Sequence, residues 1–330
     1  MKPLVARLSR RSLLAAAALG ATAPQIMASR RTASRTVRIA ATPTAVLVWL
    51  ADAAGFFQKT GFDVQVTRYT SGTLTAPAMI AGDADLATRS EYAFITAAFS
   101  APELRVIASI SQSRTVSLFG NAERGLTEPD KLGGRVLAVV GDSFGEFLLE
   151  RFLLSEGADP AQVVRLRPPE IVQAALEGAV DGGVVWDPYL RQISIELGDD
   201  FVELSDPAQH EYHFLLHGTA DWLAQNREAA QAVLQGLRVA SHMAEQEPEA
   251  AKRLLAKRLD LDLAIVDYLW PKHTLKLGMS QALLRLMEDE AWFRIERGLS
   301  VGQVPNFLQR LYPAPLLAVE PEAVSVIGLR

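Results

Sequence analysis

The 330-residue sequence contains no cysteine, and this absence excludes several kinds of protein at once. Without thiols there is no disulfide framework, no thiolate-bound metal, no lipid-modified cysteine and no cysteine nucleophile. Charged residues make up 22% of the chain and hydrophobic residues 49%, which is typical of an ordinary globular protein. The formal net charge is −5 and no basic stripe is present, so the sequence predicts no nucleic-acid partner.

The common catalytic motifs are absent as well. We find no Walker loop, no G-x-S-x-G elbow and no nucleophile beside an obvious base, so we predict a protein that is not an enzyme and has no cofactor. His210, His213 and His217 are close in sequence, and they could form a metal site or lie near a hinge. Because this segment reads as loop and strand, without an HExxH helix, we predict no metal.

Long hydrophobic runs are also missing, although the first 28 residues resemble an export signal. The apolar stretch Leu13–Ala21 is shorter than the roughly 20 residues that span a bilayer. Ser9–Leu14, which holds Arg10 and Arg11, resembles a twin-arginine signal, and an ordinary secretion signal is the alternative. Both readings predict cleavage near Ala28 and a periplasmic protein.

One sequence pattern occurs twice in the remaining chain, at residues 62–88 and 161–185. Each copy has a β-branched strand, a helix, a Gly-x-x-Asp turn (Gly82–Asp85 and Gly178–Asp181) and another strand, and each follows a strand that runs into a helix. Two βαβαβ halves predict an α/β protein with two lobes. Each lobe would contain a parallel or mixed sheet flanked by helices, with a ligand cleft between the lobes.

The order of these segments predicts a discontinuous first lobe. We expect residues 36–119 and 216–330 to form lobe 1, and residues 120–215 to form lobe 2. The chain should cross between lobes near 117–125 and again near 210–218. From Asp221 onward the 3.6-residue periodicity predicts helices, so the C-terminal part of lobe 1 should be helical.

Loops that follow strands carry the first candidate binding residues. Backbone N–H groups at a helix N-terminus bind anionic oxygens, and Thr42, Thr44 and the loop Gly141–Ser143 precede predicted helices. Simple capping without a ligand is the alternative at each loop. Ser71 and Gly72 form a third polar loop at the same rim.

The third strand of each repeat ends in residues suited to recognition. Arg89 could give a bidentate fork to a sulfonate or carboxylate, and Ser90 and Glu91 follow it. In the other copy Trp186 could stack on a ligand, while Asp187 or Glu91 could take an amine. The alternatives are an ion pair of Arg89 with one of these carboxylates, and a core position for Trp186.

Several stretches together resemble a known family, the type II periplasmic binding proteins of ABC importers. Its nitrate, sulfonate and taurine branch, which also contains binders of thiamine pyrimidine precursors, is the most similar. The resemblance covers about Val37–Arg258 and rests on four stretches: Ala54–Ala87, Asp130–Val136, Gly141–Ser143 and Ala175–Tyr189. It implies a monomer that closes by a hinge over a small molecule, with permease and ATPase partners at the inner membrane.

The resemblance and the loop chemistry give one predicted ligand site. Its residues are Thr42, Thr44, Ser71, Gly72, Arg89, Ser90, Glu91, Asp142, Ser143, Trp186 and Asp187. The negative charge of Asp142 favours a zwitterion or cationic heterocycle over nitrate or a simple alkanesulfonate. A thiamine-precursor binder, a sensor subunit and an enzyme that resembles a pyrimidine synthase are the alternatives. The enzyme alternative is disfavoured, because pyrimidine synthases of that group depend on a cysteine-rich segment and this chain contains no cysteine.

Replacing Arg10 and Arg11 by lysine tests the export signal. The twin-arginine reading predicts that the precursor stays in the cytoplasm, because lysine does not reproduce the guanidinium pair. Cell fractionation followed by immunoblotting would detect this. Normal export of the double variant would instead indicate a general secretion signal.

Overall fold

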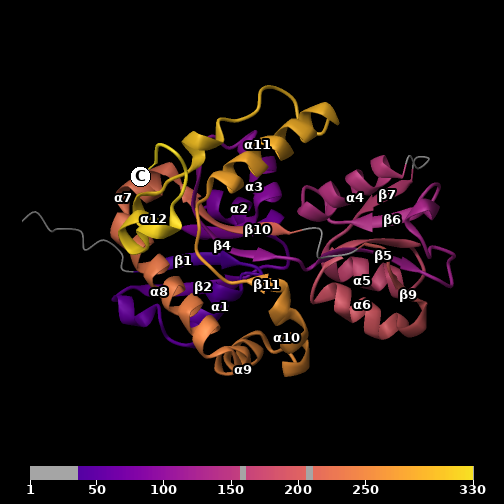
Figure 1. The fold of residues 1–330 in the computed structure, drawn as a ribbon, viewed down its shortest axis with the longest axis horizontal. Coiled ribbons are helices and arrows are strands. Elements are labelled where there is room, and N and C mark those ends of the chain that lie inside the picture. The colour runs from indigo at the N-terminus through magenta and orange to yellow at the C-terminus, as the bar shows by residue number, and fades with distance from the viewer. Residues whose placement is uncertain (1–35, 157–160, 206–210, 330) are drawn as a thin grey trace, which may run out of the picture. The chain divides into compact units, whose positions relative to one another are not determined.

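The computed structural model describes residues 36–156, 161–205 and 211–329, all within the unit Ser34–Arg330. The predicted signal segment 1–28 lies outside these residues. None of the helices described is both long and apolar enough to cross a membrane. The structure contains two separate β-sheets with helices against them, so the predicted α/β class with two mixed sheets is confirmed (Figure 1).

The first sheet has six strands in the order β11-β4-β10-β3-β1-β2. Its strands are β1 (Thr36–Ala41), β2 (Asp63–Arg68), β3 (Leu86–Ser90), β4 (Leu104–Ser113), β10 (Tyr212–Thr219) and β11 (His273–Thr274). β1 pairs in parallel with β2 and β3, whereas β10 is antiparallel to both β3 and β4. The late strand β10, salmon in Figure 1, therefore lies among the indigo and purple strands of the N-terminal part.

The second sheet has five strands in the order β7-β6-β8-β5-β9. Its strands are β5 (Val116–Asn121), β6 (Val136–Val139), β7 (Gln162–Arg165), β8 (Gly182–Trp186) and β9 (Phe201–Glu203). β6 pairs in parallel with β7 and β8, and β5 is antiparallel to β8 and β9. The parallel core β7-β6-β8 thus has the same arrangement as β2-β1-β3 in the first sheet.

The aspartate of each Gly-x-x-Asp turn has the same role in both copies. Oδ2 of Asp85 accepts a hydrogen bond from the Arg38 backbone N–H on β1 at 2.8 Å. Oδ2 of Asp181 accepts one from the Val136 N–H on β6 at 2.9 Å. Each carboxylate also binds an arginine, Arg38 in the first copy and Arg124 in the second. The repeated turn therefore fixes the third strand of each copy against the first.

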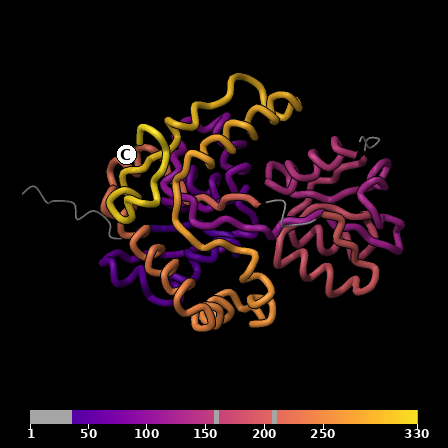
Figure 2. Tube along the Cα trace, viewed as in Figure 1, coloured from indigo at the N-terminus to yellow at the C-terminus, as the bar shows by residue number. Residues whose placement is uncertain are grey.

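Helices cover both sheets. Against the second sheet lie α4 (Phe144–Ser155), α5 (Pro168–Leu176) and α6 (Tyr189–Leu197). The other helices are α1 (Val46–Ala53), α2 (Gly72–Ile80), α3 (Glu91–Ala98), α7 (Ala220–Gln225), α8 (Arg227–Gln246), α9 (Pro248–Leu259), α10 (Leu263–Leu269), α11 (Gln281–Glu296) and α12 (Ala314–Val319). Figure 2 shows the C-terminal third, orange to yellow, wrapped around the first sheet.

Short 3₁₀ turns complete the chain. They are η1 (Gln58–Thr60), η2 (Pro129–Lys131), η3 (Gly198–Asp200), η5 (Trp270–Lys272), η6 (Phe307–Arg310) and η7 (Pro321–Ala323).

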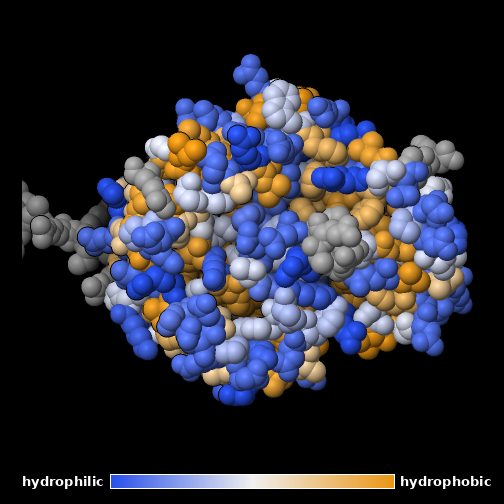
Figure 3. Space-filling model, in the orientation of Figure 1, coloured by the Kyte–Doolittle hydropathy of each residue, from blue (hydrophilic) through white to orange (hydrophobic). Residues whose placement is uncertain are grey.

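The face in Figure 3 mixes polar and apolar residues, as is usual for a folded surface.

A buried tryptophan anchors the first strand-to-helix connection. Trp49 on α1 is fully buried, and its indole N–H donates to the backbone oxygen of Thr42 at 2.7 Å. From the other side, the guanidinium of Arg258 on α9 lies over the Trp49 ring and binds Asp52 at 2.6 Å. The loop that ends β1 is consequently held in place by the core beneath it.

The strands show where the chain changes sheet. β4 ends at Ser113 in the first sheet and β5 begins at Val116 in the second. β9 ends at Glu203 in the second sheet and β10 begins at Tyr212 in the first. The division into two lobes, with its expected boundaries 119/120 and 215/216, remains a proposal.

Two glycines in β8 let three strands approach closely, which predicts a large cost for adding a methyl group. A Cβ at Gly183 would lie 2.3 Å from the Ala138 backbone oxygen on β6. Gly183→Ala should therefore lower the free energy of unfolding by about 1–3 kcal/mol or more, measured by urea denaturation. Gly278→Ala is the control, because a Cβ there meets nothing within 4 Å. Equal stability of both variants would contradict the prediction.

Candidate functional site

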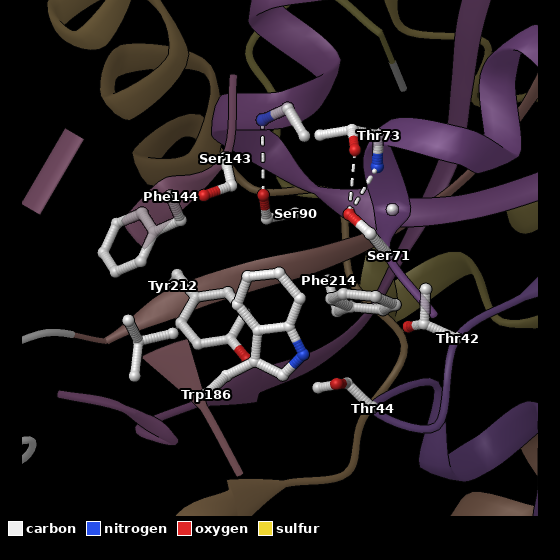
Figure 4. A pocket seen from close by; sticks show the side chains of 13 residues that line it. Thr42, Thr44, Ser71, Thr73, Ser90, Ser143, Phe144, Trp186, Tyr212 and Phe214 are labelled. Carbon is white, nitrogen blue, oxygen red and sulfur yellow. Dashed lines mark hydrogen bonds between the residues drawn. The ribbon is translucent and has the colours of Figure 1, made fainter. Parts of the chain in front are cut away.

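A pocket lies where residues from both sheets meet, and the space between its lining atoms, with open solvent included, is roughly 390 Å³ (Figure 4). It brings together seven predicted site residues: Thr42, Thr44, Ser71, Gly72, Ser90, Ser143 and Trp186. The lining residues that the sequence analysis missed are Thr73, Ala93, Val116, Phe144, Tyr212 and Phe214. Strand ends and strand-to-helix loops supply most of its polar groups.

Three of the serines are N-caps of helices. Ser71 accepts a hydrogen bond from the Thr73 N–H at the start of α2, and Ser90 accepts one from the Ala93 N–H at the start of α3. In the second sheet, Ser143 accepts from the Glu146 N–H at the start of α4. The positive ends of three helix dipoles therefore meet at one pocket. Such an arrangement stabilises negative charge without a cationic side chain.

Two threonines extend this polar wall. Thr42, at the end of β1, is 2% exposed, and its hydroxyl has no hydrogen-bond partner among the described residues. Thr44 lies just before α1 and is also buried. A buried hydroxyl without a partner is costly, so the Thr42 side chain is suited to donating to a bound molecule.

The opposite wall is aromatic. It consists of Phe144, Trp186, Tyr212 and Phe214, with Val116 beside them. In Figure 4 the Trp186 indole lies next to the Tyr212 ring, with its nitrogen on the side of Phe214 and Thr44. Phe144 stacks on Tyr212 at 5.0 Å between ring centroids, so α4 of the second sheet contacts β10 of the first. The pocket thus combines neutral donors with an apolar face.

Arg89 does not line the pocket, although its neighbour Ser90 does. Successive strand residues point to opposite faces, so only one of the two can reach the cleft. The Arg89 guanidinium is buried, donates to the Ala93 backbone oxygen at 2.9 Å and forms no ion pair with a described residue. Burial lowers its pKa to about 9. Arg89 pairs with neither Glu91 nor Asp187 among the described residues, and its Nε and Nη2 atoms have no hydrogen-bond partner there.

Glu91 is likewise outside the pocket. It is the first residue of α3, fully buried, and burial raises its pKa well above the usual carboxyl range. Burial also raises the pKa of Glu290 on α11, and the charge of Glu91 adds to that effect. Both carboxyl groups therefore favour the neutral form. A neutral Glu91 places less negative charge beside Ser90 at the N-terminus of α3 than an ionised one would.

Asp142 points away from the pocket toward the C-terminal helix α11. Its backbone has a φ of 56°, and its exposed carboxylate lies 3.3 Å from the guanidinium of Arg294. Arg294 itself is buried and also donates to the Tyr92 hydroxyl at 3.0 Å. The Asp142 carboxylate therefore faces Arg294 and does not line the pocket.

Asp187 is paired as well, on the other side of the pocket. Its buried carboxylate accepts a hydrogen bond from Lys272 Nζ at 2.9 Å. Burial raises the pKa of Asp187, against the opposing effect of Lys272. Burial lowers the pKa of Lys272, but the charge of Asp187 and the Tyr268 hydroxyl raise it overall. The carboxylate expected to take a ligand amine thus already holds an amine of the protein.

The two aspartate pairs join elements of different sheets. Asp142 and Asp187 follow β6 and β8 of the second sheet, while Arg294 and Lys272 lie in C-terminal segments packed on the first. Near Asp142, Phe147 of α4 packs between Tyr92 of α3 and Phe293 of α11. The pocket is accordingly flanked on two sides by contacts between the sheets.

The two described histidines of the predicted cluster, His213 and His217, contact different parts of the protein. His213 contacts the Ser109 hydroxyl at 2.9 Å, and burial lowers its pKa to about 4. His217 is fully buried against the Phe94 ring. His210 lies outside the described residues. Within the described part of the chain, no group of three or more His, Cys, Asp or Glu residues could hold a metal ion.

Both sheets thus supply helix N-termini to one shared pocket, and the comparisons with known proteins show the family to which the chain belongs. Residues 42–251 match the model of the NMT1/THI5 like family. The chain therefore belongs to that family, and the resemblance to periplasmic sulfonate, nitrate and taurine receptors is confirmed.

Two curated relatives are binding proteins. One, from Brucella abortus (strain 2308), is 24% identical over 229 residues, which are 66% of this chain and 69% of the relative. The taurine-binding periplasmic protein of Escherichia coli (strain K12) is 27% identical over 145 residues, 42% of this chain and 43% of the relative.

Solved structures share the fold. The alkanesulfonate-binding protein of Xanthomonas axonopodis pv. citri, bound to MOPS, has a TM-score of 0.77 and 16% identity, and the match covers 84% of this chain and 98% of that one. A desulfurization enzyme also matches, with a TM-score of 0.67, 14% identity and coverage of 86% and 98%. The fold alone thus accommodates binding proteins and an enzyme.

Replacing Lys272 by methionine tests the buried pair. It leaves the Asp187 carboxylate without its cation, which should lower the free energy of unfolding by about 3–5 kcal/mol near neutral pH. The folded state then favours the protonated carboxyl even more strongly. The loss should therefore shrink as the pH falls toward the unfolded-state pKa of about 3.9.

Thermal and urea unfolding at several pH values would measure this loss. Adding Asp187→Asn to Lys272→Met is the matched control, because it removes the uncompensated charge and should recover part of the stability. A loss in Lys272→Met that does not change with pH would contradict the prediction.

Proposed function

We propose that this chain is an exported solute-binding component of an ABC importer, and that it captures a small organic oxyanion in the pocket between its two sheets. The observation that carries the proposal is the meeting of three serine-capped helix N-termini, from both sheets, at a pocket with an unpartnered buried threonine hydroxyl. Membership of the NMT1/THI5 like family and the binding proteins among its relatives support this role.

Each wall of the pocket has its own part in this proposal. The hydroxyls of Thr42, Ser71 and Ser90, with nearby backbone N–H groups, would hold the oxygens of a sulfonate or carboxylate, whereas the Ser143 hydroxyl already donates to the Val140 backbone oxygen. The Trp186 indole N–H has no partner among the described residues and could add a donor, while its ring covers the organic part of the ligand. A ligand held by both sheets would favour the closed form, as in hinge closure.

The chemistry of the lining favours an anion without an amine. Among the described lining residues there is no carboxylate to receive an ammonium group, because Asp142 and Asp187 bind Arg294 and Lys272 instead. This reverses the sequence-based preference for a zwitterion or cationic heterocycle. We therefore place sulfonates and carboxylates ahead of taurine and of thiamine pyrimidine precursors.

A binding role also suits the lining better than catalysis. The serines are engaged as helix caps, and no histidine, carboxylate or amine stands beside them among the described lining residues to act as a base. In this role the protein would work as a monomer in the periplasm, with a permease and an ATPase as partners.

Isothermal titration calorimetry with Thr42→Val tests the site. The substitution keeps the side-chain shape but removes the hydroxyl that faces the ligand. It should weaken binding of an alkanesulfonate roughly tenfold or more, as expected for a lost hydrogen bond to a charged group. Because the hydroxyl has no hydrogen-bond partner among the described residues, the stability of the fold should be equal or higher.

Thr67→Val is the matched control, since Thr67 is exposed on β2 and does not line the pocket. The unmodified protein should bind an alkanesulfonate more tightly than taurine or an aminopyrimidine. Unchanged affinity in Thr42→Val would remove Thr42 from the site. If the folded parent protein binds none of the anions, the proposed function is wrong.

A further inference from the structure

Arg89 is a buried cation for which the described part of the chain supplies no anion. The residue is 2% exposed, and it forms no ion pair with a described carboxylate. Its Nη1 donates to the Ala93 backbone oxygen at 2.9 Å, whereas Nε and Nη2 have no described partner. Burial lowers its pKa to about 9, so the guanidinium still carries its charge near neutral pH. Such a charge is costly, because it has left water without gaining a counterion.

The internal repeat indicates that the fold does not require a cation at this place. Asp85 and Asp181 bind the first strand of each copy in the same way. Counted from these aspartates, Arg89 in β3 corresponds to Val185 in β8. Val185 is fully buried in the apolar core of the second sheet. Where one copy has a valine, the other has a charged group whose burial costs free energy, which indicates a role outside the packing of the fold.

The guanidinium lies directly behind the polar wall of the pocket. Its hydrogen-bond partner Ala93 lines the pocket, and the Ala93 N–H binds the hydroxyl of Ser90, which lines it too. Gly72, a third lining residue, packs so closely that a Cβ there would lie 2.9 Å from the Arg89 Cβ. Arg89 is therefore placed beneath the first turns of α2 and α3, whose capped N-termini meet at the pocket.

We propose that Arg89 is the counter-charge of the bound anion, which it attracts through the first turn of α3 without touching it. This inference rests on the proposed function and adds the residue that makes an uncharged pocket selective for negative charge. The lining supplies hydroxyl and N–H donors, which a polar but uncharged molecule could also use. The charge behind these donors distinguishes an anion from such a molecule.

Other titratable groups around the pocket leave the charge of Arg89 in place. Lys272 and Arg294 flank the pocket, but each is bound to an aspartate. Burial lowers the pKa of His217 on β10 well below its usual value, and the charge of Arg89 lowers it further, so this histidine stays neutral. Burial also keeps Glu91 biased toward its neutral form. An anion in the pocket would therefore be the compensating charge.

The expected size of the effect follows from the separation of the charges. One helical turn spans about 5 Å, so an anion at the N-terminus of α3 would lie roughly 5–10 Å from the guanidinium. Opposite charges at that separation inside a protein change an affinity on the order of tenfold to a hundredfold. By linkage, the anion favours the charged arginine by the same factor.

Calorimetric titration of the mature protein with methanesulfonate and with methanesulfonamide tests the proposal. The two molecules have nearly the same shape, but only the first is charged at neutral pH. Arg89→Met and Arg89→Gln remove the charge, and the glutamine keeps a hydrogen-bond donor; Arg89→Lys keeps the charge. Arg105→Met is the matched control, because Arg105 binds backbone oxygens at the opposite edge of the same sheet and does not line the pocket.

The two neutral variants should bind methanesulfonate about tenfold or more weakly than the parent, while their affinity for methanesulfonamide stays the same. Arg89→Lys and Arg105→Met should bind both molecules as the parent does. Without ligand, the neutral variants should unfold at the same or a higher temperature, because an uncompensated buried charge is gone. An arginine with a merely structural role would instead affect both molecules alike and lower the stability when it is replaced.

The outcomes separate this proposal from the proposed function. If the parent binds methanesulfonate and the neutral variants bind it equally well, or lose both molecules alike, the role of Arg89 is wrong and the proposed function stands. The same holds if neither neutral variant folds, since Arg89 is then a structural residue. If the parent, shown to be folded by circular dichroism, binds no anion, the proposed function fails and the role of Arg89 with it.

Discussion

Parallel strand pairing is the constraint on which the rest of this structure depends. Since β1 lies between β2 and β3, and β6 between β7 and β8, the carboxyl ends of three neighbouring strands emerge at one edge of each sheet. Helices must begin there, and their first N–H groups need partners. Ser71, Ser90 and Ser143 supply those partners, so the capping of the fold and the polarity of the pocket come from the same residues.

The charged side chains near the pocket interact with other parts of the protein and do not line the pocket. Asp187 and Asp142 bind cations from the C-terminal segments, while Arg89 and Glu91 are buried behind β3 and α3. Charges at strand ends are therefore used to hold elements of the two sheets together. The lining of the pocket consists of hydroxyls, helix N-termini and aromatic rings, which suits the proposed ligand, an anion whose charge is delocalised over several oxygens.

Local signals in the sequence predicted much of the fold. A helix was expected after the loop Gly141–Ser143 and further helices from Asp221 onward, and the structure has α4 and α7 to α11 there, with Ser143 and Asp262 as the N-caps of α4 and α10. β5 was missed because its short sequence, Val116–Asn121, follows β4 after only two residues and was read as part of a crossing.

The candidate site was predictable where it depends on capping and loop position, and unpredictable where it depends on distant partners. Serines before helices could be found from the sequence alone. No local pattern indicates that Lys272 binds Asp187 across 85 residues, or that Arg294 reaches Asp142 across 152. The sequence showed that Arg89 and Ser90, as neighbours on a strand, point to opposite faces. Which of the two faces the pocket could be assigned only from the pairing of β10 with β3.

The uncharged lining of the pocket has a consequence for the conditions in which the protein can work. The only ionisable side chain among the described lining residues is the Tyr212 phenol, and burial raises its pKa further from neutrality. Affinity for a strong acid anion would then stay nearly constant from mildly acidic to mildly alkaline surroundings. In the proposed role outside the cytoplasm, where the acidity of the medium varies, hydroxyl and backbone donors would keep the capture of a solute nearly independent of pH.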